Sequence, residues 1–323
     1  FVHLCALVSS WLKSQIEMLK IGITGMSAGN AHPYSWSSII NGKYNGAEIT
    51  AIGYPGVTAY LDANKDTLGL PEAKVTYVWT QDLSVSKSIA ASSGIENIAE
   101  SAEDMIGKVD AVILARDDAE FHVEMAKPFI EAGIPIFIDK PLAIRQEDLD
   151  WFEEKHAAGK FIMSCSSMRY ANECRVVKQS LGALGRMELV TGVGKKDWLK
   201  YGVHMVEALF ATLGDPKVAT GKHTGKKGKD VVHITFENGL PATIHLFMDI
   251  AGTFQLSFFG QQAWQRADIK NSYSMFRDNI IEFLRSVQEG KPRLSFDKTR
   301  NIINTVIAAE TSRVSGGKII HLK

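Results

Sequence analysis

The stretch Phe137-Ile138-Asp139-Lys140-Pro141-Leu142-Ala143 decides the fold class of this 323-residue chain. It continues the apolar run 134–138 and precedes a helical pattern rich in acidic residues at 146–158. A lysine just past a buried strand lies where open α/β sheets bind ligands, outside the carboxyl ends of their strands. The proline after Lys140 fixes φ and removes a backbone donor, so it holds the lysine on a rigid turn. Taken alone, the pattern also fits an ordinary turn with a solvated lysine.

Short apolar runs alternate with helical patterns on both sides of this stretch. We expect strands at 19–24, 74–79, 109–115, 134–138 and 161–165, and helices at 36–41, 80–91, 101–107, 119–132 and 146–158. The alternation predicts an α/β fold with a Rossmann-type, doubly wound parallel sheet and right-handed crossovers. Residues 44–73 interrupt the alternation of strands and helices. The short segment 48–52 resembles a strand, but Tyr54 and Pro55 follow it where a ribose-binding acid would be expected. We therefore interpret 44–73 as an inserted region.

Beyond residue 167 the pattern changes to longer strands and helices. We expect strands at 186–193, 229–237, 240–249, 252–260 and 318–322, and helices at 172–181, 198–213, 274–289 and 298–315. Asn238-Gly239 between two of these strands is a strong hairpin signal. The second half is thus predicted to be an α+β domain with an open, mostly antiparallel sheet that helices cover on one side. We assign 18–167 to dinucleotide binding and 168–323 to substrate binding and oligomerisation.

Residues 1–17 differ in character from the rest of the chain. They are mostly apolar as far as Leu12 but lack the basic start and the clear cleavage site of a signal peptide. Met18 directly precedes the first expected strand, as a natural start would. We expect 1–17 to be an extension, either upstream sequence or an artificial addition, whose removal leaves folding and cofactor affinity intact; a signal peptide is the alternative.

Composition and charge narrow the function further. Lys+Arg and Asp+Glu both number 36, so the net charge points neither to nucleic acid nor to an anionic membrane as a partner. No apolar run reaches the ~20 residues that a membrane helix needs. The three cysteines and nine histidines show no metal-binding spacing, and we expect no metal site. The cysteine usage is typical of the reducing cytoplasm, which is where we expect the protein.

Small residues follow the first expected strand. Such a loop lets a phosphate approach backbone N–H groups at the start of a helix. Ser27 and Asn30 stand where a G-x-G-x-x-G loop has its second and third glycines, so the usual spacing is broken. The expected cofactor contacts are Gly25, Ser27, Ala28, Gly29, Asn30 and His32 in this loop, then Thr80, Asp82, Arg116, Asp117, His122, Asp139 and Lys140 after later strands. Because Thr80 occupies the ribose position, the sequence does not separate NAD from NADP.

A second group of chemically active side chains lies in Tyr201-Gly202-Val203-His204-Met205-Val206-Glu207. On a helix, His204 and Glu207 are three residues apart and share a face. A lone helical histidine is more often structural than catalytic. A catalytic role for His204 is therefore favoured only in combination with the Asp-Lys-Pro stretch at 139–141.

Asp-Lys-Pro at 139–141 and Tyr-Gly-x-His-x-x-Glu at 201–207, with the same order of elements over 18–323, resemble the Gfo/Idh/MocA (glucose–fructose oxidoreductase/inositol dehydrogenase) family. The resemblance implies NAD or NADP as cofactor and Lys140 and His204 as catalytic residues. It also implies substrate contacts from Arg169, Tyr170, Lys200, Tyr201 and Glu207. The chain departs from the family pattern at Asp139 (usually Glu), 116–118 (commonly Thr-Pro), Lys200 (usually Asp) and Glu207 (usually Asp).

Lys200 leaves two interpretations open. Hydride removal from a carbinol needs a base whose pKa lies near the working pH. His204 can provide this base, while Lys140 stabilises the developing oxyanion. If Lys200 faces inward, it lowers the pKa of both His204 and Lys140 by like-charge repulsion. Alternatively, it recognises an acidic substrate.

The expected function is therefore NAD(P)-dependent oxidation or reduction of a sugar-like or cyclitol-like substrate. Two alternatives remain: a non-catalytic ligand or nucleotide sensor on the same fold, and a lyase or glycosidase that uses NAD transiently. The small-molecule partner would be a polyol or sugar derivative. We also expect a homodimer or homotetramer, because the strands in 229–260 carry apolar residues on both alternations, as in Ile244, Leu246, Phe247 and Met248, which leaves an apolar outer sheet face.

Overall fold

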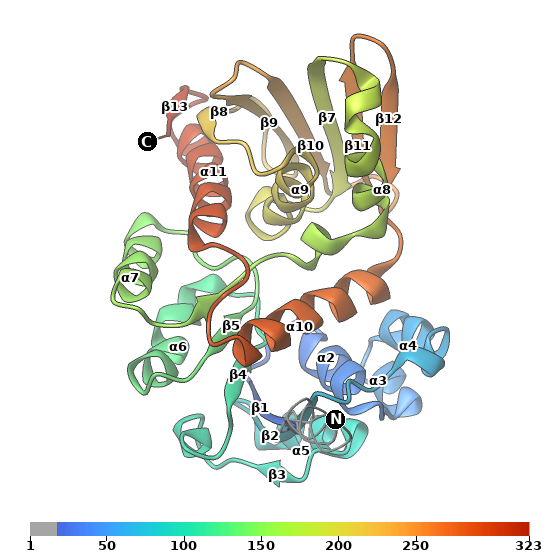
Figure 1. Ribbon diagram of the computed structural model, residues 1–323, viewed down its shortest axis with the longest axis vertical. Coiled ribbons are helices and arrows are strands. Elements are labelled where there is room, and N and C mark those ends of the chain that lie inside the picture. The colour runs from blue at the N-terminus through green and yellow to red at the C-terminus, as the bar shows by residue number, and fades with distance from the viewer. Residues whose placement is uncertain (1–17, 323) are drawn as a thin grey trace, which may run out of the picture.

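The computed structural model describes residues 18–322, so the expectation for residues 1–17 lies outside the described part of the chain. Two sheets, one above the other in Figure 1, organise the molecule. The first has the order β3-β2-β1-β4-β5-β6 and is parallel throughout. Its strands are β1 Leu19–Thr24, β2 Ala73–Trp79, β3 Asn97–Ile98, β4 Ala111–Leu114, β5 Ile136–Ile138 and β6 Ile162–Met163. This confirms the predicted Rossmann-type sheet.

Helices cover both faces of the first sheet, which explains its continuously apolar strands. The side chains of β4 and β5 are all buried. The helices of this half are α2 His32–Asn41, α3 Gly46–Ala51, α4 Pro55–Asp62, α5 Leu83–Ser93, α6 His122–Glu131 and α7 Gln146–Ala157. Helices α6 and α7 share a core with one face of the sheet, and α2 and α5 with the other.

The second sheet has the order β12-β11-β7-β10-β9-β8-β13 and is antiparallel except for the pair β7–β10. Its strands are β7 Met187–Lys195, β8 Val218–His223, β9 Lys229–Phe236, β10 Pro241–Phe247, β11 Phe254–Gly260, β12 Trp264–Asp268 and β13 Ile320–His321. The remaining helices are α8 Asn172–Ser180, α9 Trp198–Leu213, α10 Ser272–Gln288 and α11 Phe296–Val314. Residues of α9 and α11 form a core with one face of this sheet, as predicted for an open α+β domain.

Helix α10 follows the second sheet in sequence but packs against the first half of the chain. It crosses the space between the two sheets in Figure 1. Tyr273, Ile280 and Phe283 are buried in the same core as Trp36 and Phe137. The rings of Phe137 and Phe283 lie 5.7 Å apart between centroids. The chain thus returns to its first domain after building most of the second.

Several local expectations were wrong. The predicted helix 101–107 is only the 3₁₀ turn Glu103–Met105, since Ile106 leaves the helical region and Gly107 has a positive φ of 78°. The inserted region consists mainly of α3 and α4. Strand β3 was missed because two residues carry no periodic pattern, and β12 because it is an edge strand whose Trp264 is 62% exposed. Strand β8 was missed as well.

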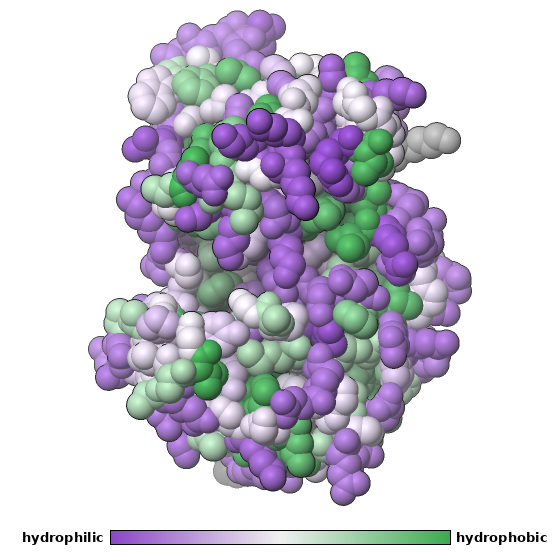
Figure 2. Space-filling model, turned by 180° about the vertical axis from the view of Figure 1, so that it is seen from behind, coloured by the Kyte–Doolittle hydropathy of each residue, from purple (hydrophilic) through white to green (hydrophobic). Residues whose placement is uncertain are grey.

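The surface opposite to the view of Figure 1 is mostly hydrophilic, with hydrophobic side chains in small groups (Figure 2). Among residues 18–322, no helix combines the length and the apolar character needed to cross a membrane.

Candidate active site

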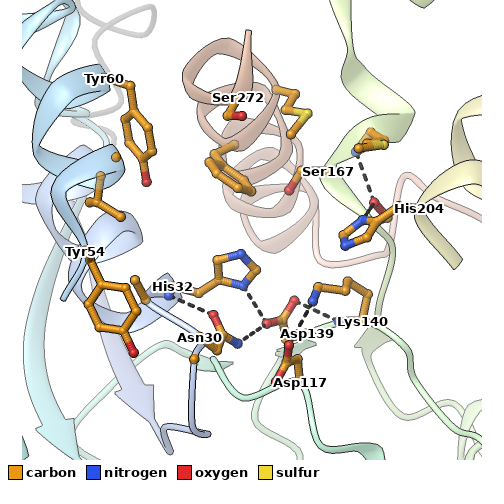
Figure 3. A pocket seen from close by; sticks show the side chains of 18 of the residues that line it. Asn30, His32, Tyr54, Tyr60, Asp117, Asp139, Lys140, Ser167, His204 and Ser272 are labelled. Carbon is orange, nitrogen blue, oxygen red and sulfur yellow. Dashed lines mark hydrogen bonds and ion pairs between the residues drawn. The ribbon is translucent and has the colours of Figure 1, made fainter. Parts of the chain in front are cut away.

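A cavity of about 490 Å³ lies where the two halves of the chain meet (Figure 3). Lys140 and His204, the two residues predicted to be catalytic, both line it. One wall comes from the first half: Gly29, Asn30, Ala31, His32, Asp117, Asp139 and Lys140, with Gly53, Tyr54, Pro55, Gly56, Val57 and Tyr60 of the inserted region. The other comes from Ser166, Ser167, Met168, Tyr201, His204, Phe254, Ile269, Ser272, Met275 and Phe276.

Lys140 is a buried ammonium group held by carboxylates. It is 5% exposed, and its Nζ donates to Asp117 Oδ2 at 3.2 Å. Burial lowers the pKa of Lys140, but the charges of Asp139 and Asp117 outweigh that effect and raise it. Lys140 is therefore a fixed positive charge at neutral pH, suited to stabilising an oxyanion.

Asp139 fixes the position of the loop after β1. Its Oδ2 accepts from Asn30 Nδ2 at 2.9 Å and pairs with His32 Nδ1 at 2.6 Å, while its Oδ1 accepts from the Lys140 backbone N–H at 2.8 Å. Burial raises the pKa of Asp139, yet His32 and Lys140 hold it well below its usual range. Asn30, which replaces a glycine of the usual loop, thus contributes an amide that binds this buried carboxylate (Figure 3).

Ser27 joins the loop after β1 to the loop after β4. Its Oγ donates to Asp117 Oδ1 at 2.6 Å and accepts from the Asp117 backbone N–H at 3.0 Å. The next acid, Asp118, is bound by the Arg116 guanidinium through two hydrogen bonds of 2.5 Å. Uncompensated carboxylates beside a pyrophosphate would repel it, but here Ser27 and Lys140 bind Asp117 and Arg116 binds Asp118.

His204 is a neutral imidazole in this cavity. Its Nδ1 lies 2.6 Å from Ser166 Oγ. Burial and the charge of Lys140 lower its pKa well below 6.5. In the tautomer whose Nδ1 donates to Ser166, Nε2 has a free lone pair and can accept a proton.

Arg169 and Glu207, both predicted to contact substrate, lie behind the cavity instead of lining it. The Arg169 guanidinium pairs with Glu207 and, at 2.6 Å, with Asp215. Glu207 Oε2 also accepts from the Ser166 backbone N–H at 3.2 Å. Burial raises the pKa of Glu207, and Arg169 opposes that shift. The network supports the turn that presents Ser166 to His204.

Replacing Arg169 by methionine is expected to lower the free energy of unfolding by about 2 kcal/mol, because Glu207 loses its partner in a buried position. This loss of stability is smaller than it would be if both carboxylates lost their partners, because Lys298 still binds Asp215 at 2.9 Å. Urea denaturation measures the effect. Lys298→Met, which removes a lysine that is 45% exposed, is the matched control and should change stability by less than about 1 kcal/mol. Equal effects of the two changes would contradict this assignment.

Lys200 does not face the cavity. It is exposed in the first turn of α9, where its backbone N–H donates to the Asp197 side chain at 3.1 Å. The structure contradicts the interpretation in which Lys200 faces inward and lowers the pKa values of His204 and Lys140, because Lys200 is exposed and the causes of both shifts lie in other residues. The lysine from this region that lowers the pKa of His204 is Lys196, whose effect is smaller than those of burial, Lys140 and His32.

Other predicted site residues have structural partners and do not line the cavity. His122 is buried with its ring nitrogens 3.1 and 2.8 Å from the carbonyl oxygens of Leu142 and Arg116. Asp82 caps α5 by accepting from the Ser84 backbone N–H at 2.7 Å, and Thr80 Oγ1 donates to the Asp82 carbonyl at 2.7 Å. Gly25, Ser27, Ala28, Arg116 and Tyr170 also lie outside the cavity lining. Their predicted roles toward cofactor or substrate stay predictions.

The sequence interpretation missed the contribution of the inserted region and of α10. Tyr54 and Tyr60 project toward the cavity from one side, and Ser272 lies on α10 at its back (Figure 3). Burial raises the pKa of the Tyr54 phenol, although a hydrogen bond from the Gly29 backbone opposes the shift. The one available signal was the aromatic content of 54–60, which the interruption of the strand pattern obscured.

The loop after β1 and the start of α2 suit a dinucleotide. The first turn of α2 holds no acidic residue, although Asn30 Oδ1 already accepts from the His32 backbone N–H at 2.9 Å and Pro33 has no N–H to offer. Gly29 has a positive φ of 79° and open space around its Cα. Backbone N–H groups in a small-residue loop of this kind can bind phosphate. Residues 25–32 would hold the pyrophosphate of a nicotinamide dinucleotide.

Comparisons with known proteins agree with this geometry. Residues 47–159 match the family model GFO_IDH_MocA, described as an oxidoreductase family with an NAD-binding Rossmann fold. No curated protein matches the chain.

Solved structures of similar fold cover nearly the whole chain. Myo-inositol 2-dehydrogenase from Lactobacillus plantarum is 16% identical, with a TM-score of 0.74 over 95% of this chain and 100% of its own. Scyllo-inositol dehydrogenase from Lactobacillus casei with bound NAD(H) and scyllo-inositol is 14% identical, with a TM-score of 0.73 over 94% and 99%. GenD2 from gentamicin A biosynthesis, in complex with NAD, is 16% identical, with a TM-score of 0.73 over 95% and 97%. At these identities the likeness establishes the fold.

Proposed function

We propose that this chain, whose residues 47–159 match the model of the Gfo/Idh/MocA family of NAD-binding oxidoreductases, transfers hydride between nicotinamide and a hydroxyl or keto group of a sugar-like or cyclitol-like substrate. The observation that carries the proposal is the pairing of a charged lysine and a neutral histidine in one cavity. A bound nicotinamide supplies the hydride acceptor or donor. The residues of the chain handle the proton and the charge on oxygen.

In the oxidation direction, His204 Nε2 accepts the hydroxyl proton of the substrate. The Lys140 ammonium stabilises the negative charge that develops on the same oxygen. Asp139 and Asp117 keep Lys140 protonated, so Lys140 contributes charge and His204 contributes basicity. The opposite shifts of the two pKa values support this division of roles.

The cavity lining supports a substrate with several oxygen atoms. The side chains of Asn30, Asp117, Ser166, Ser167 and Tyr201 supply donors and acceptors besides the two catalytic groups. A polyol needs several such partners, because each buried hydroxyl left unpaired costs about 1–3 kcal/mol.

Two experiments test the proposal in sequence. Mass spectrometry of the denatured protein, purified and after incubation with NAD or NADP, identifies the bound nucleotide. A panel of sugars and cyclitols, starting with myo-inositol and scyllo-inositol, is then assayed for absorbance of the reduced cofactor at 340 nm. Turnover with one panel member supports the proposal. Bound nucleotide without net redox change on any substrate would favour an NAD-assisted lyase or glycosidase, and failure to bind nucleotide would favour a sensor.

Gly25→Ala is expected to weaken NADH binding about tenfold or more, because the loop after β1 must shift to accept a side chain. At the positive φ of 76°, a Cβ would lie 3.0 Å from Arg116 Cδ and 3.1 Å from Met125 Cε. NADH fluorescence titration measures the change. Gly159→Ala is the matched control, since Gly159 has a φ of 80° but nothing within 4 Å of the added Cβ. Unchanged affinity in Gly25→Ala would place the cofactor elsewhere.

We further propose that the outer face of the second sheet forms a homodimer or homotetramer interface. Trp264 and Val193 are 62% and 37% exposed, and the rings of Phe259 and Trp264 stack with centroids 6.1 Å apart. An apolar outer face of an open sheet favours association. Light scattering at micromolar concentration should give a mass of at least two chains, and Trp264→Lys should lower it. A monomeric wild-type protein would rule out this interface.

A further inference from the structure

The turn before α9 has an unusual backbone conformation. Lys196 has a φ of 83°, and Asp215 is the one other non-glycine residue with positive φ among residues 18–322. Left-handed backbone is unfavourable for a side chain such as lysine, which forms no local bond that offsets the strain. Non-glycine residues held in this conformation cluster at functional sites.

The conformation brings the Lys196 ammonium to the Tyr201 phenol. Lys196 Nζ donates to Tyr201 Oη at 2.6 Å and lies 4.4 Å from the ring centroid. An ammonium group has only donors, so the phenolic oxygen must be the acceptor. The hydrogen of the phenol is then left for another acceptor, and Tyr201 Oη has no second hydrogen-bond partner among the described residues.

The ring of Tyr201 is fixed on the cavity wall. It stacks on Phe254 with centroids 6.0 Å apart and planes 9° from parallel, and its centroid lies 5.1 Å from that of His204. Tyr201 and Lys140 line the same cavity, and Tyr201 is among the groups that raise the pKa of Lys140. The Tyr201 ring therefore lies beside His204 on the wall of the cavity that Lys140 also lines.

We propose that Lys196 and Tyr201 act as one unit, in which Lys196 holds the phenolic O–H of Tyr201 as a hydrogen-bond donor to the reacting oxygen of the substrate. The inference rests on the proposed function and adds a second donor to that of Lys140. During oxidation the hydroxyl proton goes to His204, and the hydride leaves carbon with its electron pair to the nicotinamide. Tyr201 keeps its proton throughout. Lys196 is a positioning residue, because it acts through Tyr201.

The unit predicts coupled kinetic effects. Tyr201→Phe should lower kcat about 100-fold, as removal of an oxyanion donor does, with a smaller effect on KM. Lys196→Met should lower kcat about tenfold or more, and the double variant should be no worse than Tyr201→Phe alone. Lys196→Arg should recover part of the loss. Lys217→Met, which removes an exposed lysine that does not line the cavity, is the matched control and should stay within twofold of wild type.

Two further measurements distinguish the positioning role of Lys196 from a purely structural role. Lys196→Gly should lower kcat as Lys196→Met does while leaving the unfolding temperature unchanged or higher, because glycine accepts the left-handed backbone. Lys196→Met should also move the acidic limb of the rate profile to higher pH, since it removes one of the charges that lower the pKa of His204. Lys140, His32 and Asp139 are the other charged or titratable groups that act on His204.

Nuclear magnetic resonance of protein labelled with ¹³Cζ-tyrosine tests the contact without a substrate. The Tyr201 signal, assigned from its absence in Tyr201→Phe, should move in Lys196→Met and stay in place in Lys217→Met. An unmoved signal in Lys196→Met overturns the unit, as does a double variant whose loss equals the product of the two single losses. If the signal moves but no polyol is turned over, the proposed function fails and the donor role fails with it, while the Lys196–Tyr201 contact stands.

Discussion

Lys140→Met is expected to lower kcat/KM about 1,000-fold while dinucleotide affinity stays within a few fold, because the charge acts on the oxyanion of the transition state. Methionine has nearly the same length and keeps the apolar contacts of the lysine stem. The carboxylate of Asp139 retains hydrogen bonds from Asn30 and His32, so the turn should stay in place. Steady-state kinetics and NADH fluorescence titration measure the two quantities.

The control for Lys140 is Lys160→Met, just past the C-terminal end of α7, where the lysine Nζ donates to the Glu131 carbonyl oxygen at the surface. This variant should behave as wild type in both measurements. A comparable loss of NADH affinity and of kcat/KM in Lys140→Met would instead assign the lysine to cofactor binding. Wild-type turnover in Lys140→Met would exclude the proposed mechanism.

His204→Asn is expected to lower kcat/KM by about 100-fold or more, because asparagine cannot accept a proton at neutral pH. The pKa of His204 lies well below 6.5, so the wild-type enzyme should keep its activity as pH falls below 6.5. Activity should then fall only as pH drops through the lowered pKa of His204, where the imidazole becomes protonated and loses its lone pair. A pH–rate profile of kcat/KM measures the acidic limb.

Ser166→Ala provides the companion test for His204. The variant loses the 2.6 Å contact that orients the imidazole but keeps the base. A loss smaller than that of His204→Asn is therefore expected, with an acidic limb still present in the rate profile. An unchanged acidic limb in His204→Asn would show that another group, such as His32, is the base.

The meeting of Lys140 and His204 could be predicted from sequence because both belong to regular elements. Lys140 follows a buried parallel strand, whose carboxyl end faces the ligand side of the sheet. His204 lies on α9, whose observed bounds Trp198–Leu213 match the predicted ones. Periodicity therefore predicted the elements, and the family resemblance predicted that the two motifs meet.

Lys196 could not be found in the same way. Its contact with Tyr201 depends on a left-handed turn, and a lysine at that position carries no signal for positive φ. Lys200 was predicted instead because it occupies the position of a family acid. In the structure it lies in the first turn of α9 and is exposed, and helical periodicity does not determine where a long side chain in a first turn projects.

Asn30 and Ser27 show a different limit of sequence interpretation. Their departure from the glycine pattern indicated a weakened phosphate loop. The structure gives both side chains partners on other loops, Asp139 for Asn30 and Asp117 for Ser27. Residues 109 and 90 positions apart in the chain form these bonds, so no local pattern could have shown them.

The return of α10 to the first domain has a consequence for biosynthesis. A ribosome that has made residues 18–167 has produced every strand of the parallel sheet, yet Phe283 and Ile280, which close its core beside Trp36 and Phe137, are still untranslated. The nascent first half therefore exposes an apolar face until more than 100 further residues have emerged, and such faces recruit chaperones or aggregate. An excised fragment ending at 167 should be insoluble, whereas co-expression with a peptide spanning 272–288 should recover it, and a freely soluble fragment would show that α10 is dispensable for this core.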